Sequence, residues 1–221
     1  PAKVKEVKIP EPVKVKKAPQ NFSKIVLYGS NNSCKTQLFY SLLMEKNPLD
    51  FQTVTSVSPN TSETFKFNGK VTPLVDVPGH SNFETKIGKF LDTNCLLLFV
   101  MRTGSKEHNY LGKTAYKLYE VLTKQDLVKQ KITLGIVVVK DEGFEGREME
   151  SEFRKELEKE IERIKFSRRT HVNTEEGAGA GGDYLKDIKE NFELGHIQAK
   201  ESSFLFMKLG QDSLRDLINL I

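Results

Sequence analysis

Residues 29–36 read GSNNSCKT and match, at all but one defining position, the loop G-x-x-x-x-G-K-[ST] that binds phosphate groups. Gly29, Lys35 and Thr36 stand at the required offsets, and Cys34 takes the place of the second glycine. In such a loop the backbone N–H groups surround the phosphates at a helix N-terminus, where the helix dipole favours anions. Lys35 would lie along the β and γ phosphates, and the Thr36 hydroxyl would bind Mg²⁺.

A second motif, DVPGH, follows at residues 76–80. We expect the Asp76 carboxylate to hold Mg²⁺, usually through water, and the N–H of Gly79 to meet the γ phosphate. Either motif alone is a weak match, but the two in this order at strand ends are specific. The other residues that we expect to line the phosphate site are Asn31, Asn32, Ser33 and Cys34.

Alternating apolar and amphipathic stretches predict the elements that position these motifs. The run KIVLYG at 24–29 predicts a buried strand, and residues 35–46 predict a helix, so the loop lies between a strand and a helix. The apolar runs 95–101 and 132–139 are typical of parallel strands covered on both faces. Residues 64–77 predict two strands around the Asn68-Gly69 turn. We also expect helices at 108–125, 147–165 and 212–221, and a last strand at 202–207.

This alternation predicts an α/β fold with a mainly parallel sheet and helices on both faces. Ligands of such folds bind at the carboxyl ends of the strands, where the loop at 29–36 falls. A chain of 221 residues fits one sizeable domain, which we place at 22–221 with a polar insertion at 166–200. That insertion is long for a connection in a compact domain, so we expect it to be mobile or to dock something.

Charge and cysteine content exclude several classes of protein. Residues 1–20 contain six Lys and two Glu, so they carry the whole formal net charge of +4 and the rest is neutral. A neutral body argues against a nucleic-acid surface, and we predict no direct nucleic-acid partner. The two cysteines and four histidines give neither a disulfide framework nor a zinc pattern. No apolar run approaches the roughly 20 residues of a membrane-spanning helix.

The basic segment 1–21 is rich in Pro and Lys and favours extended conformations. It is either a linker or an extended segment lying on a partner, or a disordered tail, and its charge would also suit an anionic membrane surface.

The motifs resemble those of Ras-like GTPases with the P-loop small GTPase fold, and more narrowly those of the signal recognition particle receptor beta subunit family. The resemblance rests on GSNNSCKT, on QTVTSVSP (52–59), on VTPLVDVPGH (71–80) and on NFELGHI (191–197), and it covers residues 22–221. It implies a GTP- and Mg²⁺-binding subunit at the cytosolic face of the endoplasmic reticulum membrane. Such a subunit binds the receptor alpha subunit in its GTP form and is anchored by an N-terminal membrane helix, which we expect to lie outside this chain.

The resemblance also implies roles for individual residues. Thr53 is similar to the threonine of the first switch that senses Mg²⁺ and the γ phosphate. His80 stands where many GTPases have a glutamine that orients the attacking water, so it is the candidate catalytic residue. A histidine there can equally pack against the partner, and we favour that role.

Three departures from the family pattern concern the nucleotide. Cys34 adds a side chain where a glycine lets the backbone approach phosphate, which predicts steric conflict or a widened loop unless the small thiol turns aside. A thiol at a helix N-terminus can also have a lowered pKa and be reactive.

The guanine-reading motif N-K-x-D falls on VKDE, where Val139 replaces Asn, Lys140 is retained and Glu142 replaces Asp. In the last base-contacting loop, near MKLG (207–210), only Lys208 matches. The sequence therefore leaves guanine selectivity open.

These features favour a receptor subunit whose nucleotide orders the switch regions for a protein partner, with weak or absent hydrolysis. The alternative is a cycling Arf/Sar-like small GTPase that regulates membrane traffic. A P-loop kinase or ATPase is disfavoured, because the sequence offers neither an arginine-bearing lid nor a substrate pocket.

Overall fold

The computed structural model describes residues 21–44, 51–83, 86–104, 108–123, 132–172, 188–194 and 201–208, together with Leu185 and Ile197. The predicted tail up to residue 20, the Gly-rich stretch 177–182 and the predicted helix at 212–221 lie outside the described residues.

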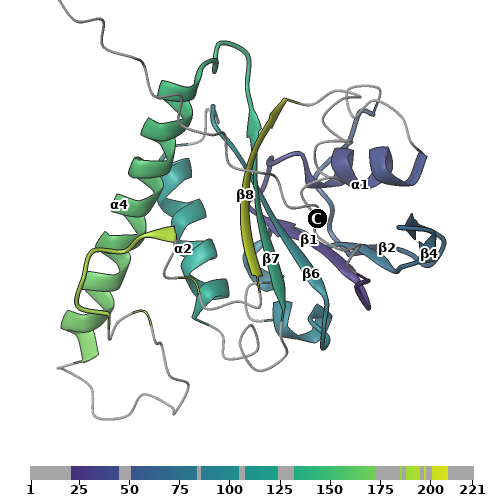
Figure 1. The fold of residues 1–221 in the computed structure, drawn as a ribbon, viewed down its shortest axis with the longest axis horizontal. Helices are drawn as coiled ribbons and strands as arrows, with labels where there is room; N and C mark the ends of the chain where they lie inside the picture. The colour runs from purple at the N-terminus through teal and green to yellow at the C-terminus, as the bar shows by residue number, and fades with distance from the viewer. Residues whose placement is uncertain are drawn as a thin grey trace, which may run out of the picture.

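A six-stranded sheet in the order β2-β5-β1-β6-β7-β8 forms the centre of the molecule (Figure 1). All neighbouring strands are parallel except β2, which pairs antiparallel with β5. The mainly parallel sheet predicted from the sequence is therefore confirmed. The strands are β1 (Ile25–Gly29), β2 (Asn60–Ser62), β5 (Leu74–Asp76), β6 (Leu96–Arg102), β7 (Thr133–Lys140) and β8 (Glu201–Lys208).

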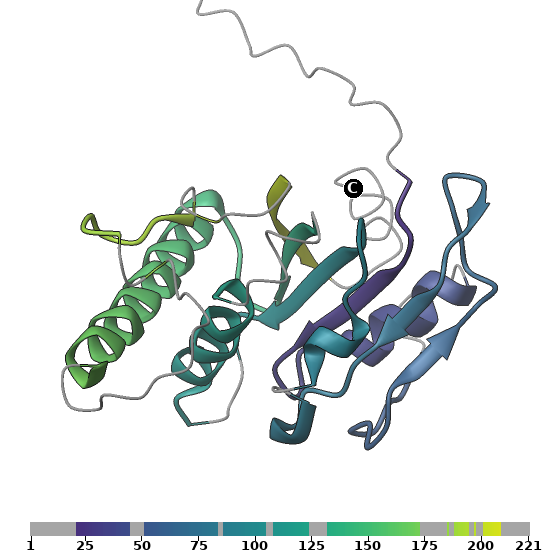
Figure 2. The ribbon, with the colours of Figure 1, turned by 90° about the horizontal axis from the view of Figure 1, so that it is seen from below.

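Helices cover both faces of this sheet, as predicted. Figures 1 and 2 show α1 (Lys35–Met44) on one face, and α2 (Tyr110–Leu122) with α4 (Arg147–Val172) on the other. Two short 3-10 helices, η2 (Ser81–Phe83) and η3 (Ile87–Phe90), connect β5 to β6.

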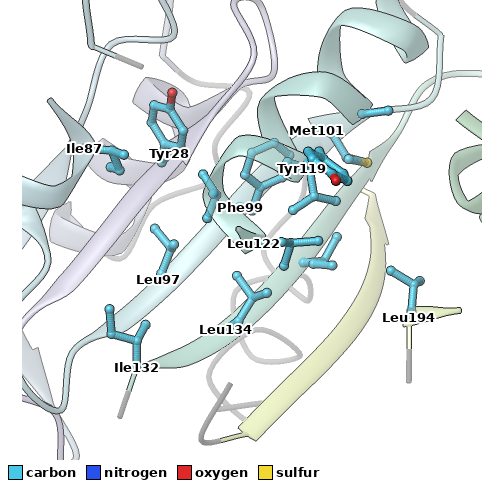
Figure 3. Close-up of a cluster of buried hydrophobic side chains, with 14 of the residues drawn as sticks. Tyr28, Ile87, Leu97, Phe99, Met101, Tyr119, Leu122, Ile132, Leu134 and Leu194 are labelled. Carbon is cyan, nitrogen blue, oxygen red and sulfur yellow. The ribbon is translucent and has the colours of Figure 1, made fainter. Parts of the chain in front are cut away.

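The central strands are buried on both faces because successive side chains of a strand point to opposite sides. In β6, Leu97, Phe99 and Met101 pack into the cluster under α2 and α4, which Figure 3 shows with Tyr119 and Leu122 of α2. The alternate β6 residues Leu96, Leu98 and Val100 belong to the cluster under α1. An uninterrupted apolar run is therefore what this position in the sheet requires.

The sequence predicts two strands of one hairpin over residues 64–77, and the structure differs from this prediction. The Asn68-Gly69 turn is confirmed, with φ angles of 48° and 77°, and it joins β3 (Lys66–Phe67) to β4 (Lys70–Val71) as a separate small sheet. The chain then leaves the hairpin at Pro73, which has no N–H for a ladder and whose carbonyl accepts a hydrogen bond from the N–H of Ile25 at 2.8 Å. Residues 74–76 consequently pair with β1 as β5.

The helix predicted at 147–165 continues to Val172, so residues 166–172 of the predicted insertion are helical. Polar contacts hold these last turns: Arg168 pairs with Glu120 of α2, and Arg169 donates to the carbonyl of Ile188. Apolar periodicity did not indicate this extension, because Phe166 is 65% exposed.

Candidate nucleotide-binding site

The phosphate loop begins at Gly29, the last residue of β1. Gly29 has a φ of 148°, and a Cβ on it would lie 2.0 Å from the backbone oxygen of Val100 in β6. Any side chain at this position would collide with the neighbouring strand. The first glycine of the motif is therefore required by the packing of β1 against β6.

Two residues of the loop adopt the left-handed conformation that usually needs glycine. Asn32 has a φ of 55° and Cys34 a φ of 68°. Asn tolerates this region, whereas a cysteine there is uncommon. Where right-handed and left-handed backbone conformations alternate, successive N–H groups point to the same side and form an anion-binding concavity. Cys34 thus takes a backbone conformation typical of glycine while carrying a side chain.

The thiol of Cys34 is half-buried against the cluster under α1. Burial raises its pKa, and the nearby Arg102 and Lys35 oppose that effect without overcoming it. The structure therefore does not favour the alternative of a reactive thiol with a lowered pKa, because desolvation of the thiolate outweighs the positive charges around it.

Lys35 lies inside the loop and points back at its carbonyl groups. Its Nζ donates to the carbonyl of Ser30 at 2.5 Å and to Oγ of Ser33 at 3.2 Å. The side chain is buried, and this burial lowers the pKa of Lys35 to about 8, partly offset by the charge of Asp76. Because burial disfavours the ammonium, an anion beside it would stabilise the charged form.

Oxygen atoms gather beside the loop, around the carboxylate of Asp76. The hydroxyl of Thr36 donates to Oδ2 of Asp76 at 2.7 Å, and Asn60 Nδ2 donates to the same oxygen at 3.0 Å. Oγ of Ser56 lies 3.2 Å from the Thr36 hydroxyl. Among the described residues, Oδ1 of the fully buried Asp76 has no hydrogen-bond partner. Mg²⁺ prefers such hard oxygen ligands, together with water and phosphate oxygens, so these residues fit the ion.

A cavity of about 400 Å³ opens beside Thr36 and Ser56. Its walls are the loop residues 31–36, the stretch 53–56 and residues 78–79, so all the predicted phosphate-contacting loop residues from Asn31 to Thr36 face one space. Thr53 lies on this wall, but the side chain of that stretch that approaches Thr36 is Ser56.

Gly79 packs directly against the loop, as the second motif predicts. A Cβ on Gly79 would lie 2.6 Å from the backbone nitrogen of Asn31 and 2.7 Å from the carbonyl of Gly29. From the opposite side, Nζ of the buried Lys117 in α2 donates to the Gly79 carbonyl. Lys117 therefore holds the backbone whose N–H we expected to meet the γ phosphate, and no motif indicated this residue.

His80 is exposed, and its Nδ1 accepts a hydrogen bond from the N–H of Asn82 at 3.3 Å. It lies on the wall of a second cavity of about 600 Å³, which α2 and α4 also line.

The residues expected to read the base are buried, paired with other groups or exposed. Val139 is buried, Nζ of Lys140 donates to Glu150 of α4 at 2.8 Å, and Glu142 is exposed. Lys208 ends β8 opposite Lys140 in the strand register. The charged groups that approach the loop from this side are instead Arg102 and Asp141, which sequence reasoning missed.

A β1–loop–α1 unit with an aspartate at the end of the adjacent β5 defines the phosphate-loop α/β fold of small GTPases. Comparison with known proteins is more specific: the family model of the signal recognition particle receptor beta subunit matches residues 20–201. The chain belongs to this family.

A relative from Dictyostelium discoideum, the signal recognition particle receptor subunit beta, is 27% identical over 108 residues. This match covers 49% of the chain and 36% of the relative, so the chain matches about a third of that protein's length.

Solved structures share the fold at low sequence identity. The mammalian SRP receptor structure matches with a TM-score of 0.60 and 20% identity, over 88% of this chain and 96% of that one. The receptor subunit SRb-GDP from Chaetomium thermophilum matches with a TM-score of 0.57 and 16% identity, over 93% and 100% of the two chains. The SRb-GDP-Mg structure from the same organism has a TM-score of 0.55 and 15% identity, over 91% and 100%.

Proposed function

We propose that this chain binds a guanine nucleotide with Mg²⁺ at the loop 29–36 and, in its GTP form, binds the alpha subunit of the signal recognition particle receptor. The observation that carries the proposal is that Lys35 and Thr36 line one cavity while the Thr36 hydroxyl donates to Asp76, which has a buried oxygen without a partner among the described residues. The GDP and GDP-Mg bound to the Chaetomium relatives support the choice of ligand.

Each group has a defined part in this binding. The N–H groups of the loop and the ammonium of Lys35 neutralise the β and γ phosphates. Thr36, Asp76 and Ser56 would hold Mg²⁺, which would neutralise part of the phosphate charge. Gly79, fixed from behind by Lys117, presents its N–H to the γ phosphate and so couples the nucleotide to the segment after β5.

We expect turnover to be slow or absent. His80 is the only candidate that the sequence offers for orienting water, and its Nδ1 already accepts from the N–H of Asn82. The alternative is a cycling small GTPase. Mg²⁺-dependent phosphate release that Thr36→Ala abolishes, at a rate unaffected by the alpha subunit, would favour that alternative.

The segment 51–59 supports a protein partner on this side of the molecule. Val54 and Val57 are 88% and 89% exposed, although both belong to the stretch that borders the nucleotide cavity. Exposed apolar side chains beside a ligand site are suited to a partner that senses the ligand. By binding the alpha subunit, the chain would hold it at the cytosolic face of the endoplasmic reticulum membrane. No helix among the described residues is both long and apolar enough to cross a bilayer, and we propose that a segment outside this chain supplies the anchor.

A pull-down with the N-terminal domain of the alpha subunit tests the partner directly. Val54→Asp with Val57→Asp should abolish capture in the presence of GTP and Mg²⁺, because two charges would replace apolar contacts. The matched control is Val71→Asp on β4, where an equally apolar side chain is 60% exposed away from the cavity, and it should be captured like the wild type. Capture that survives the double substitution would refute the proposed surface.

A further inference from the structure

An ion pair joins the carboxyl ends of β6 and β7. Arg102 is the last residue of β6, and Asp141 directly follows β7. Nε of Arg102 donates to Oδ2 of Asp141 at 3.1 Å while Nη2 donates to Oδ1, so the guanidinium grips the carboxylate at two points. The N–H of Gly104 donates to Oδ2 at 2.6 Å, and the N–H of Asp141 donates to Oγ1 of Thr103 at 3.0 Å. The pair is therefore rigidly oriented.

The pair also borders the phosphate loop. Nη1 of Arg102 donates to the carbonyl of Asn32 at 3.4 Å, and the charges of both Arg102 and Asp141 act on the thiol of Cys34. The two side chains are 30% and 18% exposed, so they remain accessible to a ligand at the loop.

The order of the strands indicates toward which strands a bound nucleotide extends. The Asp76 carboxylate, to which Thr36 donates, ends β5 on one side of β1, whereas β6 and β7 lie on the other side of β1. Terminal phosphates belong with the metal, so the nucleoside must extend toward the ends of β6 and β7. That is where Arg102 and Asp141 lie.

The residues that the family motif would place there are otherwise engaged. Lys140 pairs with Glu150 of α4, Glu142 is exposed, and Val139 offers no polar group. Arg102 lies beside Val139 in the strand register, on the neighbouring strand.

We propose that the Arg102–Asp141 pair forms the nucleoside-recognising end of the site and takes over the role that the Asn and Asp of an N-K-x-D motif would have at positions 139 and 142. This inference rests on the proposed nucleotide binding. The guanidinium of Arg102 holds the Asp141 carboxylate in a fixed orientation toward the edge of the purine. Oδ1 of Asp141 accepts only from Arg102 among the described residues, and its remaining lone pair accepts from an N–H donor of guanine.

Titration of the full chain with Mg²⁺-GDP and with Mg²⁺-pyrophosphate separates recognition of the nucleoside from recognition of phosphate. Arg102→Ala should weaken GDP binding by about 10- to 100-fold, the value of the charge-assisted hydrogen bond to guanine that is lost when Asp141 is no longer held, and pyrophosphate binding by less than about threefold. Arg102→Lys, which keeps a positive charge beside Asp141, should give an intermediate loss. Asp141→Asn should lower the ratio of GDP to ADP affinity.

The matched control is Arg168→Ala, which removes an arginine–glutamate pair between α4 and α2 outside the loop. It should leave both affinities unchanged. Equal weakening of GDP and pyrophosphate by Arg102→Ala would overturn the inference, because Arg102 would then only shape the loop. A larger loss of GDP binding from Lys140→Ala than from Arg102→Ala would also overturn it. Unaltered GDP binding by Arg102→Ala defeats this inference alone, whereas a wild type that binds neither ligand defeats the proposed function as well.

Discussion

Replacement of Cys34 by glycine and by serine tests the conformation of the phosphate loop. Cys34 has a φ of 68°, and its carbonyl accepts the hydrogen bond from the N–H of Leu38 that opens α1. The left-handed region costs an L-residue about 1–2 kcal/mol. Glycine avoids that cost but loses about 0.5–1 kcal/mol through the greater freedom of its unfolded chain. We therefore expect Cys34→Gly to be more stable than Cys34→Ser by about 1 kcal/mol, or about 2–4 °C in Tm for a chain of this size.

Serine is the informative comparison because it resembles cysteine in size and is favoured over glycine at ordinary helix N-caps. An ordinary cap would therefore reverse the order of the two variants. Urea unfolding of the nucleotide-free proteins, with unchanged m-values, gives the difference in the free energy of unfolding. A serine variant equal to or more stable than the glycine variant would show that residue 34 does not adopt the left-handed conformation. Removal of the thiol should not weaken GDP binding, since it leaves the backbone donors in place.

Three further predictions concern the same site. Gly29→Ala should lower the free energy of unfolding by about 3 kcal/mol or more, since its Cβ would lie 2.0 Å from the backbone oxygen of Val100; a loss under about 1 kcal/mol in urea unfolding would contradict that packing. Thr36→Ala removes a hydroxyl that lies 2.7 Å from Asp76. If this hydroxyl binds Mg²⁺, the ratio of the GDP affinity with Mg²⁺ to that without Mg²⁺ should fall toward one. A variant that keeps the wild-type ratio would show that Thr36 does not bind the metal. Burial lowers the pKa of Lys35 to about 8, and bound phosphate should raise this pKa again because it favours the ammonium. GDP affinity should therefore be constant below about pH 8 and fall by up to about tenfold per pH unit above it. A flat affinity profile between about pH 7 and 9 would argue against the buried ammonium as the phosphate ligand.

The parts of the fold that the sequence predicts are those with a strong local pattern. The runs that became β1, β6 and β7 are continuously apolar because both of their faces are buried. The turn at Asn68-Gly69 was predictable because these residues readily adopt positive φ. By contrast, β2 is three polar residues that form a strand only by pairing with β5, so no local pattern indicates it.

The candidate site likewise contains residues that the sequence predicts and residues that only the tertiary structure identifies. Gly29, Lys35, Thr36 and Asp76 follow from motif spacing, because backbone geometry at strand ends fixes their positions. Ser56 stands among several hydroxyl residues in QTVTSVSP, and only the tertiary structure shows which of them approaches Thr36.

Lys117 and the Arg102–Asp141 pair were not predictable. Each connects elements distant in sequence; Lys117 and Arg102 lie in no known motif, and Asp141 stands at the variable position of N-K-x-D. From the sequence alone, a single charged residue at the end of an apolar strand is interpreted as an ordinary solvent-exposed side chain. The closest sequence signal is that Arg102 and Asp141 both follow long apolar runs, which places them at one edge of a parallel sheet.

The most direct test of nucleotide binding is a calorimetric titration of the nucleotide-free chain with GTP and with ATP, each with and without Mg²⁺. The structure predicts saturable binding of one GTP per chain that Mg²⁺ strengthens and that exceeds the affinity for ATP. Absence of heat with either nucleotide, or binding of GTP indifferent to Mg²⁺, would contradict a functional site at residues 29–36.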